Sequence, residues 1–173
     1  MNKGKEVWLV KKNRNKGFSM MELIVVIAII GLFTGLASIG LQYVQAGNIR
    51  STAKSIDSNL TKLRLDTMRK EEKPIMYLYK VGDDYYMLCT TDSSMARDRN
   101  NGTHIGNSNT KITVDGSVLG STEKKIKFKK GSGAFSDDSD ARSSILVEKQ
   151  DGKGTSYKIV LVPDTGKHYM EIK

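Results

Sequence analysis

The chain has 173 residues, 38% of them apolar, and a formal net charge of +9. This composition excludes a disordered chain, and the single cysteine, Cys89, excludes an internal disulfide. Residues 1–17 hold six basic residues against Glu6, a net charge of +5, which leaves +4 for the rest of the chain. More than half of the charge that would suggest nucleic-acid binding therefore lies in a short N-terminal segment.

An uncharged apolar segment follows the basic residues. Residues 23–41 contain no charge and only two polar side chains, Thr34 and Ser38. As a helix they would be about 28 Å long, enough to cross the hydrocarbon core of a membrane. The basic segment before them predicts that the N-terminus stays on the cytoplasmic side. A cleaved secretory signal or a simple anchor are the alternatives, but the helical pattern continues beyond residues 34–38, where a signal would be cut.

The same helix is expected to run from about residue 19 to about residue 72. After residue 41 the apolar positions keep helical spacing with charged residues between them, which is typical of an amphipathic helix with one packed face. Pro74 ends the helix because it restricts the residue before it and has no N–H to donate. The residues expected on the packed face are Val44, Ile49, Ala53, Ile56, Leu60, Leu63 and Thr67.

From residue 75 the pattern alternates as it does in β-strands. Six or seven short strands predict an antiparallel sheet or small sandwich that packs on the one-sided helix, an α+β fold. Residues 91–110 and 131–143 are expected to be loops. The strands are expected in residues 75–81, 85–90, 111–117, 125–130, 144–163 (a hairpin turning at 151–154) and 167–173.

The sequence contains no catalytic constellation, so no enzyme activity, cofactor or metal is predicted. His104 and His168 share no metal-ligand spacing with Cys89, which is expected in or near the core. The acidic residues 137–140 lack the spacing of a calcium loop. Alternating lysines in residues 125–130 surround one aromatic side chain and could contact nucleic acid, although a solvated strand face is the simpler interpretation.

The start of the chain resembles the N-terminal signature of type IV prepilins and pseudopilins. The similarity rests on a basic leader that ends in Lys16-Gly17, the residues FSMME at positions 18–22, and the apolar run after them. It implies that prepilin peptidase cleaves after Gly17 and methylates the new N-terminal amine of Phe18. It also implies a pilin-like architecture of one long N-terminal helix on a β-domain. The expected divisions are a cleaved leader at 1–17, a transmembrane and filament-core half of the helix at 18–45, and a soluble domain at 46–173.

The resemblance also implies a role for Glu22. A carboxylate in an apolar environment is costly unless it is paired, and the resemblance implies that its partner is the amine of Phe18 in a neighbouring subunit. The pair would then set the stagger between subunits. Ser19-x-x-Glu22 is also a capping box, which satisfies free amides at a helix start, and both roles can hold together. Gly31 and Gly35 have the spacing that lets two helices approach closely.

The resemblance implies a structural subunit of a type IV pilus-like filament. Residues 63–87 and 156–173 are similar to the H-type pseudopilins of type II secretion and to related minor pilins, so a minor pilin or pseudopilin is expected. The implied partners are prepilin peptidase, other pilin subunits and a membrane assembly platform. The implied location is the cytoplasmic membrane, with the C-terminal domain outside, and then an extracellular filament.

Three alternatives stay open at this point. The chain could be the major pilin of the same filament, or a secreted enzyme behind an ordinary signal, which the missing catalytic cluster disfavours. It could also be a DNA-binding pilin that acts in competence. The residues that would contact DNA are Lys125, Lys127, Lys129, Lys130 and Lys167.

Overall fold

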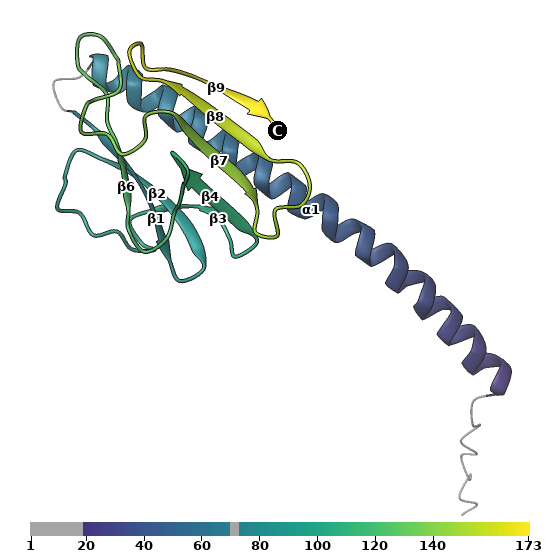
Figure 1. Cartoon of the computed structure of the whole chain (residues 1–173). Helices are drawn as coiled ribbons and strands as arrows, with labels where there is room; N and C mark the ends of the chain where they lie inside the picture. The colour runs from purple at the N-terminus through teal and green to yellow at the C-terminus, as the bar shows by residue number, and fades with distance from the viewer. Residues whose placement is uncertain (1–18, 70–72) are drawn as a thin grey trace, which may run out of the picture. The chain divides into compact units, whose positions relative to one another are not determined.

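The computed structural model describes residues 19–69 and 73–173, and for residues 34–47 it describes the backbone alone (Figure 1). The described chain forms one helix, α1 (Met20–Arg69), followed by nine strands. It divides into two compact units, Met1–Gly40 and Leu41–Lys173, and α1 contributes residues to both. The α+β fold expected from the sequence is confirmed, and the helix has nearly the expected bounds.

In the second unit, α1 buries the face that its apolar spacing predicts. Ile49, Ala53, Ile56, Leu60 and Leu63 are each at most 3% exposed. Val44 lies outside the described side chains. The buried threonines fit this face because each hydroxyl donates a hydrogen bond to the carbonyl four residues earlier. Thr52 also donates to the carbonyl of Ile105, which ties the helix to a strand.

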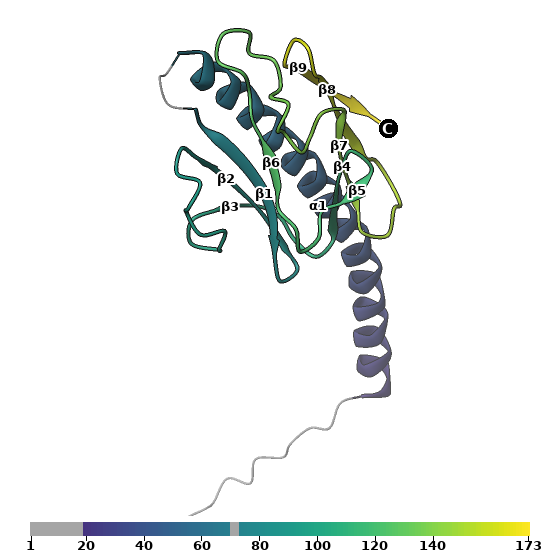
Figure 2. The ribbon, with the colours of Figure 1, turned by 60° about the vertical axis from the view of Figure 1, so that its left-hand side comes forward.

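Two antiparallel sheets pack with this part of α1 (Figures 1 and 2). Sheet A has the order β3-β2-β1-β6, and sheet B has the order β5-β4-β7-β8-β9. The strands of sheet A are β1 (Ile75–Val81), β2 (Asp84–Thr90), β3 (Thr103–Gly106) and β6 (Lys124–Ile126). The strands of sheet B are β4 (Thr110–Val114), β5 (Ser117–Val118), β7 (Ser144–Lys149), β8 (Tyr157–Val162) and β9 (Lys167–Ile172).

One apolar core joins the helix and both sheets. Leu78 of β1, Ile112 of β4 and Ile159 of β8 are fully buried and belong to the same cluster as the packed face of α1. A second, smaller cluster lies apart from this core and consists of Tyr77, Tyr79, Tyr86 and Leu88 on sheet A. Because side chains alternate along a strand, these four residues occupy the face of sheet A that points away from α1.

The strand predictions were right for the antiparallel pairs β1–β2, β7–β8 and β8–β9 and wrong in two connecting regions. β1 and β2 pair throughout their length, from Ile75↔Thr90 to Val81↔Asp84. Residues 91–110, however, are not all loop, because they contain β3 and the first residue of β4. Residues 125–130 form a strand only as far as Ile126, after which Phe128 makes an isolated bridge with Phe135.

Candidate assembly site at the start of the helix

The first turn of α1 carries Glu22 on an exposed helix start. Ser19 precedes the helix, and its hydroxyl oxygen accepts a hydrogen bond from the backbone N–H of Met21 at 3.3 Å. Glu22 lies in the first turn and is exposed. A carboxylate here is favoured by the partial positive charge of the helix N-terminus. Ser19 therefore does cap the helix, which leaves the carboxylate of Glu22 at the surface of the unit.

The first turns of α1, residues 20–33, present apolar side chains on every side around and after Glu22. Their exposed fractions run from 45% at Val26 and Ile29 to 84% at Met20. Soluble monomers rarely expose apolar patches beyond a few hundred Å², and a helix that is apolar all round belongs in lipid or among other helices. This surface therefore requires a cover. Its members are Met20, Met21, Leu23, Ile24, Val25, Val26, Ile27, Ile29, Ile30, Leu32 and Phe33.

The predicted membrane span is not confirmed. Among the residues whose side chains the structure describes, no helix is both long enough and apolar enough to cross a membrane. The span expected at residues 23–41 runs into residues 34–47, whose side chains lie outside the described part.

The other predicted assembly residues fall partly outside the described chain. Gly17 and Phe18, the expected cleavage position and mature N-terminus, lie outside it, and so do the surroundings of Gly35. At Gly31 no described atom lies within 4 Å of the position that a β-carbon would take. The helix surface at Gly31 is therefore open to the close approach of another backbone.

Comparison with known proteins bears on this N-terminal site. The family described as the prokaryotic N-terminal methylation motif matches residues 12–38. The motif supports a type IV pilin-like subunit. It implies processing by a prepilin peptidase and assembly with other pilin subunits. Searches of curated proteins and of solved structures found no match to the chain, so the expected similarity to H-type pseudopilins is unconfirmed.

The lysines expected to contact DNA lie beside an acidic loop. The ammonium nitrogen of Lys127 is 2.6 Å from a carboxylate oxygen of Asp138, and that of Lys125 is 3.8 Å from the same oxygen. Lys129 makes a similar contact with Asp137 at 2.9 Å. Carboxylates this close offset the charge that the lysines would present to a phosphate backbone.

The acidic loop is held in place by these contacts. The pKa of Asp138 is lowered to about 2 by hydrogen bonds from Lys127 and Ser136 and by the charges of the two lysines. Asp140 accepts a hydrogen bond from the backbone N–H of Lys125 at 2.7 Å. The run of aspartates at 137–140 thus serves to fix residues 131–143 against β6 and its extension. No group of three metal-ligating side chains occurs within the described ranges.

Lys130 and Lys167 line different hollows of the surface. Lys130 is exposed and lines a hollow of about 340 Å³ together with Lys73 and Phe128. Lys167 is exposed at the start of β9, beside Tyr169. Lys127 and Lys129 line the same hollow as Lys130, whereas Lys125 and Lys167 do not, and DNA binding stays a prediction.

Cys89 differs from the expectation that it lies in or near the core, whereas His104 and His168 are strand residues of β3 and β9. Cys89 is exposed rather than in the core, because it lies near the end of β2, where it lines a hollow beside Lys62 and Asp66 of α1. Atoms around its thiol still desolvate it and raise its pKa to about 11, so the reactive thiolate is scarce at neutral pH. His168 is well buried and lies 3.2 Å from the carbonyl oxygen of Asp57 and 3.0 Å from the hydroxyl of Thr61. It joins β9 to α1.

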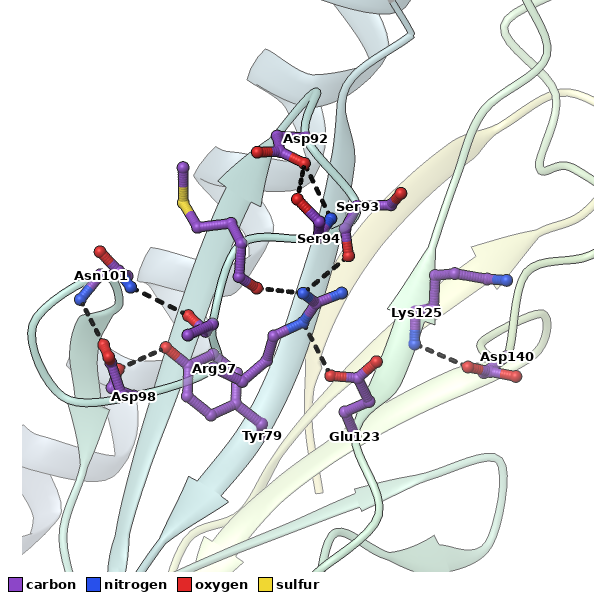
Figure 3. Close-up of polar contacts among 12 residues, drawn as sticks. Tyr79, Asp92, Ser93, Ser94, Arg97, Asp98, Asn101, Glu123, Lys125 and Asp140 are labelled. Atoms are coloured by element: carbon purple, nitrogen blue, oxygen red, sulfur yellow. Dashed lines mark hydrogen bonds and ion pairs between the residues drawn. The ribbon is translucent and has the colours of Figure 1, made fainter.

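Residues 91–102 form a loop, as the sequence predicts, but its contacts with sheet A were not predicted. It covers the outer tyrosines of sheet A: the guanidinium of Arg97 lies 3.8 Å from the ring centre of Tyr77, and Tyr79 donates a hydrogen bond to the carbonyl of Asp98 at 2.8 Å (Figure 3). Arg97 Nε lies 2.9 Å from Glu123 in an ion pair that lacks the angle of a hydrogen bond. The alternating tyrosines at 77, 79 and 86 were the available signal, because an aromatic row on an outer face needs a cover.

Proposed function

We propose that the chain is a structural, non-enzymatic subunit of a type IV pilus-like filament, and specifically a minor pilin or pseudopilin. The observation that carries the proposal is the apolar surface of residues 20–33, which is exposed on every side directly after Ser19 and Glu22. The methylation motif spans the same residues. Neighbouring N-terminal helices in a filament, and lipid before assembly, are covers that suit this surface.

Processing after Gly17 is the first part of the proposal. Prepilin peptidase would remove the basic leader and methylate the amine of Phe18. Mass spectrometry of the mature protein tests this, and a methylated Phe18 at the N-terminus is expected. A Gly17→Val variant should stay uncleaved, whereas Gly4→Val, a change outside the motif, should be processed normally. Any other mature N-terminus would contradict the proposal.

A contact between subunits is the second part. After cleavage Glu22 becomes the fifth residue, and its carboxylate would pair with the Phe18 amine of a neighbour, where the pair offsets the cost of burying either charge. The Glu22→Val variant should enter the membrane normally but be incorporated poorly into filaments, as measured in sheared filament fractions. Ser19→Ala removes the helix cap and keeps the carboxylate, so it serves as the control. If the cap were the whole role of the motif, both variants would fail to the same degree.

The location and the kind of subunit complete the proposal. Before assembly the subunit would be a single-pass protein of the cytoplasmic membrane, with residues 46–173 outside and an assembly platform as its partner. A minor pilin or pseudopilin is expected to be scarce relative to the main component of sheared filaments. Quantitative mass spectrometry of those filaments decides the matter, because a dominant share for this chain would identify it as the major pilin.

A further inference from the structure

The loop of residues 91–102 contains an asparagine followed by a glycine, at Asn101 and Gly102. Asn101 is exposed and lies in a turn. Its side-chain amide donates to the carbonyl of Ala96 at 3.1 Å, and its backbone N–H donates to the carboxylate of Asp98 at 2.9 Å (Figure 3). The backbone carbonyl of the same Asp98 accepts a hydrogen bond from the hydroxyl of Tyr79. One asparagine thus links the end of the loop to its middle and supports its contact with sheet A.

The glycine in this pair is required by packing. A β-carbon on Gly102 would lie 2.0 Å from the hydroxyl oxygen of Tyr79 and 3.1 Å from the β-carbon of Tyr86. Since no larger residue fits without moving Tyr79 or the loop, the fold requires glycine after Asn101. Glycine also leaves its backbone nitrogen unshielded, because it has no β-carbon beside it. Such an unshielded nitrogen attacks the side-chain amide carbon of a preceding asparagine most readily.

We propose that Asn101 is a site of spontaneous deamidation, and that its conversion to aspartate or isoaspartate releases residues 91–102 from the outer face of sheet A. The backbone nitrogen of Gly102 attacks Cγ of Asn101 and forms a new N–C bond. The side-chain nitrogen leaves as ammonia and takes up the proton that Gly102 loses. Water then hydrolyses one of the two ring amide bonds, which gives aspartate or isoaspartate. The sequence of steps requires water alone and no oxidant or reductant.

The product no longer supports the loop. The amide donor to the carbonyl of Ala96 becomes a carboxylate, so two acceptor oxygens face each other and a second negative charge is placed near Asp98. In isoaspartate the main chain is also longer by one carbon, which displaces Gly102 from Tyr79. The backbone at Arg97, whose side chain is now held over Tyr77, and at the already exposed Arg99 then becomes mobile, and the tyrosine cluster loses its cover. This inference does not depend on the filament proposal.

The first experiment follows the reaction itself. The full chain in detergent micelles is aged at neutral and at mildly alkaline pH and then mapped by peptide mass spectrometry. Asn101 should convert severalfold faster than Asn107, which precedes a serine, and the rate should rise with pH because the attacking nitrogen must lose a proton. Conversion of Asn101 that is no faster than that of Asn107 would overturn the proposal.

The second experiment tests the consequence. Limited trypsin digestion of the folded chain is followed at Arg97 and Arg99, relative to Lys153, an exposed lysine in the turn between β7 and β8. An Asn101→Asp variant should be cut severalfold faster at both arginines and equally fast at Lys153. Asn101→Gln, which keeps the amide and forms the cyclic intermediate slowly, should remain unmodified on ageing. Equal cleavage of Asn101→Asp and wild type at the arginines would show that the loop is not released.

Discussion

At the residue scale, Asp115 shows how one side chain organises a connection between strands. It occupies the turn between β4 and β5 with a φ of 48°, a conformation that aspartate and asparagine tolerate better than other residues with a β-carbon. Its carboxylate accepts hydrogen bonds from the backbone N–H groups of Arg142, Ser143 and Ser144 and from the Ser143 hydroxyl, at 2.7 to 2.9 Å. The turn is thereby fixed to the start of β7.

We predict that Asp115→Asn lowers the free energy of unfolding by about 1 kcal/mol. Asparagine keeps the backbone conformation, but its amide nitrogen would face N–H donors and could accept none of their bonds. This value is at the lower end of the usual cost of leaving a hydrogen-bonding group unsatisfied, because the turn is exposed to water. Urea unfolding of the full chain in micelles measures the effect. Asp151→Asn, in the exposed turn after β7, is the matched control and should change stability by less than about 0.5 kcal/mol.

The same residue predicts a dependence on pH. Partial burial alone raises the pKa of Asp115, but the hydrogen bonds from Ser144, Arg142 and Ser143 outweigh it and lower the pKa. A lowered pKa in the folded state stabilises the protein above the unfolded value of about 4, and this contribution is lost as the pH falls through the folded value. The difference between wild type and Asp115→Asn should therefore be present at neutral pH and disappear in acid. A constant difference would show that charge has no part in it.

Gly166 and Gly152 differ in what a larger residue would cost: backbone strain alone at Gly152, and strain together with steric overlap at Gly166. Both have a positive φ, 64° and 68°. An added β-carbon at Gly152 meets no atom within 4 Å, whereas at Gly166 it would lie 1.7 Å from the carbonyl oxygen of Gly133. Gly152→Ala should thus cost only the strain of the left-handed conformation, about 1–2 kcal/mol. Gly166→Ala must also displace the backbone and should lower the melting temperature clearly further. Equal losses in a thermal scan would contradict the close contact.

At the element scale, Arg64 connects α1 to two loops. Its Nε donates to the carbonyl of Gly133 and its Nη2 to the carbonyl of Thr165, each at 3.0 Å. These carbonyls belong to the loop before β7 and to the turn between β8 and β9. The planar guanidinium suits this double contact, since its donors point in fixed directions.

Substitution of Arg64 should therefore destabilise the second unit. Arg64→Ala removes both bonds and is expected to lower the free energy of unfolding by about 1–3 kcal/mol. Arg64→Lys keeps the charge but reaches one carbonyl at most, so it should recover part of the loss. Arg50→Ala, an exposed arginine on the same helix, is the control. Hydrogen exchange should rise in residues 131–134 and 163–166 for Arg64→Ala alone, and unchanged exchange there would count against the connection.

The elements that could be predicted from the sequence are those with a local signal. The packed face of α1 follows from its apolar spacing, and the hairpin of β1 and β2 from the Gly82-Asp83 turn between alternating apolar residues. β3 was missed because its four residues, THIG, contain a single large apolar side chain, and its pairing with β2 supplies what the local pattern lacks. The pairing of Lys127 with Asp138 could not be predicted either, because ten intervening residues form a loop whose path depends on the core.

At the scale of the whole molecule, one helix carries two surfaces that serve different purposes. Ile56 is fully buried in the core of the second unit, while Ile27 is 58% exposed on the segment that carries the methylation motif. The same residue type on the same helix thus belongs to the core in one place and is exposed on the surface in the other. The local sequence predicted the two halves because one has apolar residues all round and the other on one face only.

Matched substitutions at these two positions should separate folding from assembly. Ile56→Ala leaves a cavity in the core and should lower the free energy of unfolding of the second unit by about 2–5 kcal/mol. Ile27→Ala should leave that stability within about 0.5 kcal/mol of wild type and should reduce the share of the chain recovered in sheared filaments, since the removed carbons would contact lipid or a neighbouring helix. Unfolding in micelles and filament fractionation, applied to both variants, provide the measurements. If Ile27→Ala assembled as well as wild type, the exposed face at Ile27 would not be part of the contact between subunits.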